Sequence, residues 1–298
     1  MKQYFSVVFA GLSFLSSCSN NKNKPDAYGT FEATEIMVSS LATGQIMKFD
    51  VEEGQLLDSG IMIGYIDTTD LHLKREQAID TREATASRKD DLTAQIAVLE
   101  QNRDNILIEK KRVDVLLTEG AATQKQSDDI TASLNLIAKQ ISSLKIQFGG
   151  ITSHVGSITQ QIAQLDQSID RSKIINPIKG TVLTKYAEKD EVASYGKPLY
   201  KIADLSEITL RAYVGGSQLP NIKLGSTIDV VYDKDEKSNT HIQGIVSWVS
   251  SSAEFTPKTI QTKEERVNLV YAVKIRVKND GSIKIGMPGE IRILKTIN

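Results

Sequence analysis

The strongest constraint on the fold is a repeat whose two copies lie far apart in the sequence. Residues 44–66 align without gaps on residues 180–202, so the offset between matched positions is constant. Both copies contain short apolar runs between glycine turns, which is typical of short β-strands. The matched positions are Gly44 with Gly180, Ile46 with Val182, Leu56 with Val192, Gly60 with Gly196, Ile63 with Leu199 and Ile66 with Ile202. Each copy is too small to bury a core, so the repeat predicts one β domain assembled from two halves.

One exchange within the repeat concerns a turn. Gly54 of the first copy aligns with Asp190 of the second. Asp tolerates the left-handed backbone conformation better than most residues, so the exchange keeps a tight turn at both places.

The sequence between the two copies has the pattern of a coiled coil. Its second half has apolar residues at alternating steps of four and three, without a fault, which is the pattern of a helical seam. They are Ile130, Leu134, Ile137, Ile141, Leu144, Phe148, Ile151, Val155, Ile158, Ile162, Leu165 and Ile169. The first half has a weaker seam at seven-residue steps: Ala78, Thr85, Leu92, Leu99, Ile106 and Val113. The register continues through Gly149 and Gly150, so we expect one uninterrupted second helix.

Gly120 separates the two halves, and folding the chain back there tests the idea of a hairpin. When antiparallel partners are paired so that their numbers sum to 243, every seam position of the first half meets one of the second, from Val113 opposite Ile130 to Ala78 opposite Leu165. The pattern predicts a helical hairpin over residues 71–173, a rod about 70 Å long.

The first eighteen residues have the layout of a bacterial secretion signal. Lys2 precedes an apolar stretch, Val7 to Leu15, which is too short to span a bilayer. Leu15-Ser16-Ser17-Cys18 resembles a lipobox, whose cysteine carries the lipid of the mature protein, although an ordinary signal peptide with an incidental cysteine is the alternative. The following Ser/Asn/Lys-rich residues are suited to a flexible tether. We expect a chain held to a membrane through Cys18.

Composition and spacing disfavour several classes of function. Basic and acidic residues nearly cancel, 36 against 37, and no basic patch interleaved with aromatics is present, so nucleic acid is not an expected partner. His72, His154 and His241 are far apart in sequence and lack a second ligand at metal-binding spacing. We therefore expect no enzymatic activity, no metal site and no cofactor.

A split β repeat with a helical hairpin between its halves and a lipid or membrane tether resembles the periplasmic adaptor subunits, or membrane fusion proteins, of the HlyD type. The resemblance implies an elongated α+β fold: a lipoyl-like (barrel-sandwich hybrid) domain interrupted by an antiparallel coiled-coil hairpin and followed by a small antiparallel β-barrel. It divides the chain into a signal peptide (1–18), a tether with a first membrane-proximal strand (19–38), lipoyl-like halves (39–70 and 174–205), the hairpin (71–173) and the barrel (206–298).

The barrel expected from the resemblance contains five segments. Apolar runs between Gly, Pro and Asn turns predict strands within 208–214, 218–226, 244–249, 271–277 and 286–293. The segment 255–266 is especially similar to the branch of the family that accompanies ABC-type export permeases. This similarity implies a permease-facing loop with Thr256, Pro257, Gln261 and Thr262, which also connects two strands.

The resemblance also implies a contact site at the hairpin tip. Adaptors of this type carry an Arg, a Leu four residues later and a Ser seven residues after that, which touch the outer-membrane channel; here these positions are Arg112, Leu116 and Thr123. Thr keeps the hydroxyl and adds a methyl group.

A purely structural role for these residues is the alternative. Gly120 can end the first helix in a left-handed conformation, with Lys110 to Arg112 near its negative end. Thr123 with Gln126 forms a capping box for the second helix, and Asp128 and Asp129 lie near its positive end.

The resemblance implies a non-catalytic adaptor that links an inner-membrane exporter, of ABC type, to a TolC-like outer-membrane channel of a Gram-negative envelope, as a ring of typically six copies. A structural coiled-coil lipoprotein that spaces membrane and wall is the alternative from another class, and an RND or major-facilitator pump is the alternative exporter. The expected location is the periplasmic face of the inner membrane, although Ser19 is not the aspartate that retains enterobacterial lipoproteins there.

Overall fold

The computed structural model describes residues 25–235, 238–254 and 269–293, and these form two compact units. One unit combines the described residues up to 35 with those from 203 onward, and the other contains residues 36–202.

The first unit is a closed antiparallel barrel. Its strands follow one another around the barrel in the order β1, β10, β13, β12, β11 and β14, with β14 paired to β1. Alternating residues of each strand face a common core, which includes the fully buried Phe31, Leu210 and Ile275. The strand bounds are β1 (Ala27–Glu32), β10 (Glu207–Gly215), β11 (Thr227–Asp233), β12 (Asn239–Val249), β13 (Val270–Lys278) and β14 (Pro288–Arg292).

The strand expected within 19–38 is β1, which closes the barrel between β10 and β14. One expectation for this part of the chain is wrong. The segment 218–226 contains a short 3-10 turn, Leu219–Asn221, since Pro220 has no N–H for a strand ladder. The strand that sequence reasoning missed is β11, which begins two residues after Gly225 turns the chain with a φ of 81°.

The second unit contains the repeat, and its two copies form the same strands. The first copy forms β3 (Gly44–Phe49), β4 (Leu56–Leu57) and β5 (Met62–Ile66), and the second forms β7 (Gly180–Lys185), β8 (Val192–Ala193) and β9 (Pro198–Ala203). Each strand of the second copy begins at the position that the alignment matches to the start of its counterpart. The expected turns are also present, because Gly54 has a φ of 84° and Asp190 a φ of 71°.

The two copies exchange strands to build a sandwich. One sheet has the order β2-β9-β7-β4 and the other β6-β5-β3-β8, with β2 spanning Glu35–Ser39 and β6 spanning Lys173–Ile175. The short strand of each copy therefore joins the other copy's sheet, as Leu56 pairs with Thr181 and Gly44 with Ala193. A shared core of residues from both copies, including Ile46, Leu199 and Ile202, makes each half depend on the other.

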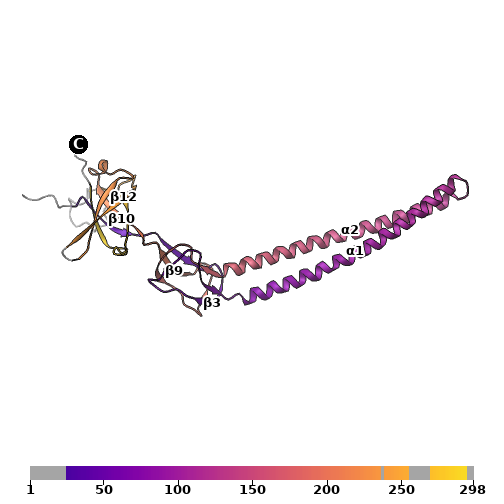
Figure 1. The fold of residues 1–298 in the computed structure, drawn as a ribbon, viewed down its shortest axis with the longest axis horizontal. Coiled ribbons are helices and arrows are strands. Elements are labelled where there is room, and N and C mark those ends of the chain that lie inside the picture. The colour runs from indigo at the N-terminus through magenta and orange to yellow at the C-terminus, as the bar shows by residue number, and fades with distance from the viewer. Residues whose placement is uncertain (1–24, 236–237, 255–268, 294–298) are drawn as a thin grey trace, which may run out of the picture. The chain divides into compact units, whose positions relative to one another are not determined.

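A helical hairpin connects the two halves of the sandwich (Figure 1). Helix α1 (Thr69–Thr118) has 50 residues and α2 (Gln124–Arg171) has 48, so the hairpin starts and ends two residues earlier than predicted. Helix α2 runs uninterrupted through Gly149 and Gly150. The apex lies at the end of the hairpin opposite the sheets.

The seam between the helices follows the predicted register. None of the predicted seam side chains is exposed, and Ile137, Ile141 and Ile158 are buried. Two ion pairs cross between the helices, Arg75 with Asp166 at 2.6 Å and Lys145 with Glu100 at 3.2 Å. Their residue numbers sum to 241 and 245, on either side of the predicted 243.

The α1 side of the seam contains an unexpected set of basic residues. Half-buried side chains occupy the positions three residues before the seam residues of α1, and they include Arg75, Arg82, Lys89, Arg103 and Lys110. Their methylene stems can cover the seam while their charged ends reach partners at its edge. The ammonium of Lys89, for example, lies 4.9 Å from the ring centroid of Phe148. This explains why the apolar seam of α1 is weaker in sequence than that of α2.

Candidate partner-binding site at the hairpin tip

The tip begins where Gly120 ends α1. Gly120 has a φ of 76°, a conformation that costs other residues free energy. The N–H groups of Gly120 and Ala121 donate to the carbonyl oxygens of Leu117 and Leu116, at 3.1 and 2.8 Å. These two bonds form a Schellman motif, which satisfies carbonyl groups left open at the helix end. The prediction for Gly120 is confirmed.

Thr123 starts α2 through the expected capping box. The Gln126 backbone N–H donates to the Thr123 hydroxyl at 3.3 Å, and the Thr123 N–H donates to the Gln126 side-chain oxygen at 2.8 Å. The Thr123 hydroxyl also lies 3.1 Å from that same oxygen. Thr123 therefore has a structural role whatever else it contacts.

A polar contact close to the turn joins the two helices. The buried Ser127 of α2 donates its hydroxyl hydrogen to an Asp114 carboxylate oxygen on α1, at 3.0 Å. Lys110 donates to the same carboxylate oxygen at 3.1 Å. The hydrogen bonds from Lys110 and Ser127 lower the pKa of Asp114 from its ordinary value of 3.8. Sequence reasoning missed this contact, because Asp114 and Ser127 are both polar residues at the edge of an apolar seam.

The charged residues expected to stabilise the two helix ends lie outside the terminal turns of the helices. No basic residue is in the last turn of α1 and no acidic residue is in the first turn of α2. The macrodipole effect falls off within the terminal turn, so Lys110 to Arg112 and Asp128 to Asp129 contribute little through it. Arg112 instead pairs with Glu109 at 2.7 Å, an exposed ion pair of small expected stability.

The outer side of α1 at the tip presents apolar side chains around Arg112. Ile108 is 61% exposed, Val115 57% and Leu116 36%, and the side chain of Arg112 is 66% exposed. Spacings of three and four residues place Ile108, Arg112 and Val115 on one face, and Leu116 lies one turn beyond Arg112. We call these four residues, with Thr123 across the turn, the tip surface.

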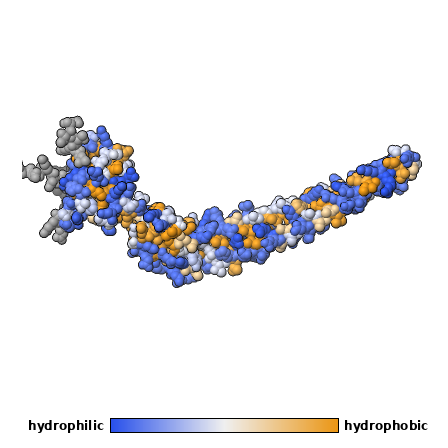
Figure 2. Space-filling view, in the orientation of Figure 1, coloured by the Kyte–Doolittle hydropathy of each residue, from blue (hydrophilic) through white to orange (hydrophobic). Residues whose placement is uncertain are grey.

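Two members of the tip surface were not among the predicted site residues. Ile108 and Val115 lie outside the three-four seam, so their apolar side chains are not used in the hairpin's own core. Apolar residues at positions that the seam leaves exposed are the sequence signal that would have identified them. Figure 2 shows hydrophobic residues alternating with polar ones along the hairpin up to the tip.

The remaining predicted site residues, Cys18 and the loop residues Thr256, Pro257, Gln261 and Thr262, lie outside the described residues. Within the described ranges, no group of three or more His, Cys, Asp or Glu side chains is arranged to hold a metal ion. His241 lies 2.8 Å from an Asp229 carboxylate oxygen. None of the helices in these ranges combines the length and the apolar character needed to cross a bilayer.

Sequence comparisons identify membrane proteins that are similar to this chain. No family model matches the sequence. The chain is 25% identical to the UPF0194 membrane protein of Yersinia pseudotuberculosis, over 89% of this chain and 88% of that protein. It is 24% identical to the UPF0194 membrane protein YbhG of Salmonella gallinarum, over 89% of this chain and 87% of that protein.

Two solved structures have a similar fold. MacA from Actinobacillus actinomycetemcomitans matches with a TM-score of 0.56 at 20% identity, over 89% of this chain and 76% of that one. The membrane fusion protein Spr0693 from Streptococcus pneumoniae matches with a TM-score of 0.57 at 15% identity, over 89% and 96%. The fold expected from the resemblance to HlyD-type adaptors is therefore confirmed: split β domain, helical hairpin and small barrel.

Proposed function

We propose that the chain is a periplasmic adaptor of the HlyD type, which connects an inner-membrane exporter to an outer-membrane channel. The observation that carries the proposal is the hairpin. A rod of two helices of 50 and 48 residues, held in register by its own seam, presents exposed apolar and basic side chains at its apex. Such an arrangement is suited to contact with another helical protein at a distance from the sheets.

The tip surface is the proposed contact with a TolC-like channel. Exposed apolar side chains around an arginine are the composition found at binding hot spots. Arg112 and Leu116 contribute little to the hairpin's own stability: the Arg112 ion pair is exposed, and it is the Leu116 backbone carbonyl that takes part in the turn. Thr123 combines both roles, because its hydroxyl is needed for the capping box.

The finer assignments belong to the same proposal. An ABC-type permease is the proposed inner-membrane partner, through the loop containing Thr256, Pro257, Gln261 and Thr262. Cys18 is the proposed lipid anchor, and a ring of six copies is the proposed assembly, with no catalytic role for this subunit. These assignments rest on the sequence resemblance. The names of the similar proteins, a membrane fusion protein and UPF0194 membrane proteins, support the association with membranes.

Measuring export distinguishes an adaptor from a structural spacer. Cells lacking the chain should accumulate more of a fluorescent export substrate, whereas loss of a spacer would change envelope integrity and leave accumulation unchanged. The deletion strain is then complemented with variants, and dye accumulation is measured together with detergent sensitivity.

Leu116→Gln is the sharpest variant because it removes an exposed apolar side chain and keeps the backbone bonds of the turn. We expect it to impair efflux with unchanged helicity, as Arg112→Gln should. Leu73→Gln is the matched control, since Leu73 is 66% exposed near the other end of α1. Normal efflux with Leu116→Gln, or equal loss with Leu73→Gln, would refute a contact at the tip. Thr123→Ser should be neutral, because serine keeps both the cap and the hydroxyl.

A further inference from the structure

The β sandwich has an apolar groove along its open side, at the base of the hairpin. The groove lies between β2, the edge strand of one sheet, and β6, the edge strand of the other, and the last turn of α2 closes one end. Its volume of about 550 Å³ is within the range of small-molecule sites, roughly 300–1,000 Å³. All of its lining residues belong to the second unit.

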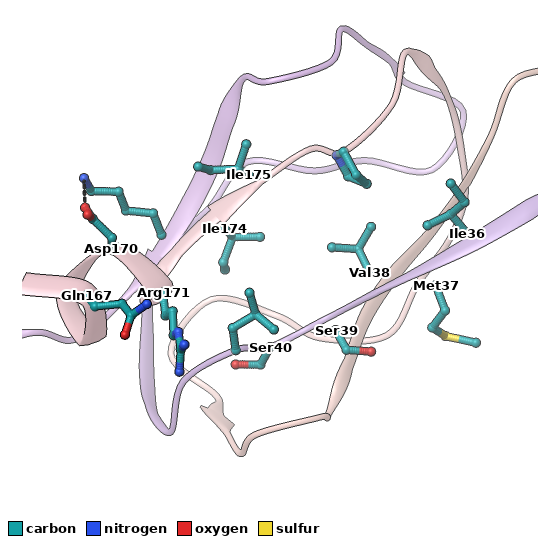
Figure 3. Close-up of a pocket in the computed structure, with 13 residues that line it drawn as sticks. Ile36, Met37, Val38, Ser39, Ser40, Gln167, Asp170, Arg171, Ile174 and Ile175 are labelled. Carbon is teal, nitrogen blue, oxygen red and sulfur yellow. Dashed lines mark hydrogen bonds and ion pairs between the residues drawn. The ribbon is translucent and has the colours of Figure 1, made fainter. Parts of the chain in front are cut away.

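Aliphatic side chains form the interior of the groove (Figure 3). Ile36 and Val38 from β2 and Ile174 from β6 point into the space between the two strands, whereas Met37 and Ser39 lie on the opposite side of β2. Ile174 is buried, and Ile36 and Val38 pack against the sandwich core. The interior therefore offers contacts only to an apolar group.

The rim adds further apolar surface. Leu41 is 55% exposed and Ile175 48%. Figure 2 shows hydrophobic residues gathered over the sheets of this unit. An apolar chain entering the groove would cover part of this surface.

One cation at the rim has no partner among the residues that the structure describes. Asp170 and Lys173 both line the groove, but they pair with each other at 2.7 Å. Arg171 lines the same groove, on the side of Ser40, and within the described ranges its guanidinium group takes part in no hydrogen bond or ion pair. Two carboxylates line an adjoining hollow together with Arg171: Asp70 pairs with Lys74, and Asp67 accepts hydrogen bonds from Thr69. The groove therefore combines an apolar interior with one cationic side chain that forms no ion pair within the described residues.

We propose that this groove binds a free amphipathic anion, a single alkyl chain ending in a carboxylate, sulfate or phosphate. The alkyl chain lies against Ile36, Val38 and Ile174, and the anionic head pairs with Arg171. A neutral apolar molecule would leave Arg171 unpaired, and a cationic amphiphile would be repelled by it. Arg171 also places a favourable charge near the C-terminal end of α2, but that role does not depend on the groove.

The test is a titration of the full chain carrying Cys18→Ser, which cannot be lipidated and is purified without detergent. Methyl groups of isoleucine are labelled for NMR, and decanoate is added below its micelle concentration. We expect saturable shifts at Ile36, Ile174 and Ile175 and none at Ile275 in the barrel core. Affinity should rise by up to about fourfold for each methylene from octanoate to dodecanoate, because each added group is buried.

Two variants test the two halves of the site. Arg171→Gln should weaken decanoate binding by about fivefold and leave decanol unchanged, because an exposed ion pair contributes modestly. Arg88→Gln, at an exposed position of α1, is the matched control and should bind like the parent. Val38→Phe should abolish binding by filling the groove, with unchanged methyl signals of the buried Ile46 and Ile202 showing that the sandwich core remains folded.

Several outcomes would overturn the proposal. Equal binding of decanoate and decyltrimethylammonium would show apolar association without a role for Arg171. Shifts spread over the isoleucines of the barrel would show nonspecific uptake. Shifts caused by phosphatidylglycerol vesicles but not by decanoate would assign the groove to a membrane surface instead of a free amphiphile.

Discussion

The buried side chain of Asn176 gives the sharpest test of how the two halves of the repeat become one domain. Asn176 follows β6 and is fully buried. Its side-chain amide donates to the carbonyl oxygens of Asp58 and Ile178, at 2.8 and 2.6 Å, and its side-chain oxygen accepts from the Tyr200 hydroxyl at 2.9 Å. Asp58 belongs to the first copy of the repeat, whereas Tyr200 and Ile178 come from the second half. Asn176 thus joins the two halves through hydrogen bonds made by a side chain that is buried from solvent.

Asn176→Ala removes three hydrogen bonds and leaves up to three buried groups without partners. Each such group costs about 1–3 kcal/mol, but the Asp58 carbonyl lies in an exposed turn and can recover water. We therefore expect the free energy of opening of the sandwich to fall by about 2–5 kcal/mol. Tyr200→Phe leaves only the Asn176 oxygen without a donor, so it should cost about 1 kcal/mol.

Native-state hydrogen exchange measures this locally. The slowest amides of β5 and β9 should lose protection in Asn176→Ala, and those of β13 in the barrel provide an internal control. Adding Tyr200→Phe to Asn176→Ala should cost nothing further, because the hydroxyl has already lost its partner. If Asn176→Ala changes the free energy of opening by less than about 0.5 kcal/mol, the idea that these bonds join the halves is wrong.

Three further predictions concern the hairpin. Gly120→Ala should destabilise the tip by about 1 kcal/mol, measured by hydrogen exchange of its amides, since alanine is strained at a φ of 76°. Hydrogen bonds, the strongest from Lys110, hold the pKa of Asp114 below its ordinary value of 3.8. The stability that they give the tip is therefore present above pH 3.8 and is lost as the pH falls through the lower, folded-state pKa. Asp114→Asn should remove this acid dependence in the same exchange measurement. Ile106→Cys combined with Ile137→Cys should form a disulfide under mild oxidation, seen as a shift on a nonreducing gel. Ile106→Cys combined with a cysteine seven residues earlier on α2 should not, because the two residue numbers then sum to 236 instead of 243.

The sequence predicted the strands of the repeat and the register of the helical hairpin. The constant offset between the two copies located the matched strands and the turn at Asp190, because two copies with the same strands and turns have the same pattern of apolar and turn residues. The seam of α2 predicted the hairpin register, since a three-four spacing fixes which face is buried. What the offset could not show is that the copies exchange their short strands, because a two-residue strand such as β4 has no pattern of its own.

Other features depended on contacts between distant segments. The place of β1 in the barrel follows from pairing with β10 and β14, which lie beyond the whole sandwich and hairpin in the sequence, and the short segment 27–32 does not reveal its partners. The basic residues within the α1 seam were also missed, because a lysine or arginine reads as solvent-exposed until its stem is seen to be half-buried.

The candidate site was predicted in part. The turn at Gly120 and the cap at Thr123 follow from local backbone chemistry, and both are present. The Asp114–Ser127 contact and the exposure of Ile108 and Val115 required the register of the two helices, so they became evident only in the structure.

The proposed contact between the hairpin tip and an outer-membrane protein can be tested by site-specific photo-cross-linking in cells. A photoreactive residue is placed at Leu116 and, as the control, at Leu73 near the other end of α1. We expect an adduct with an outer-membrane channel from Leu116 and none from Leu73. Absence of an adduct from Leu116 in cells that still export, or the same adduct from both positions, would contradict it.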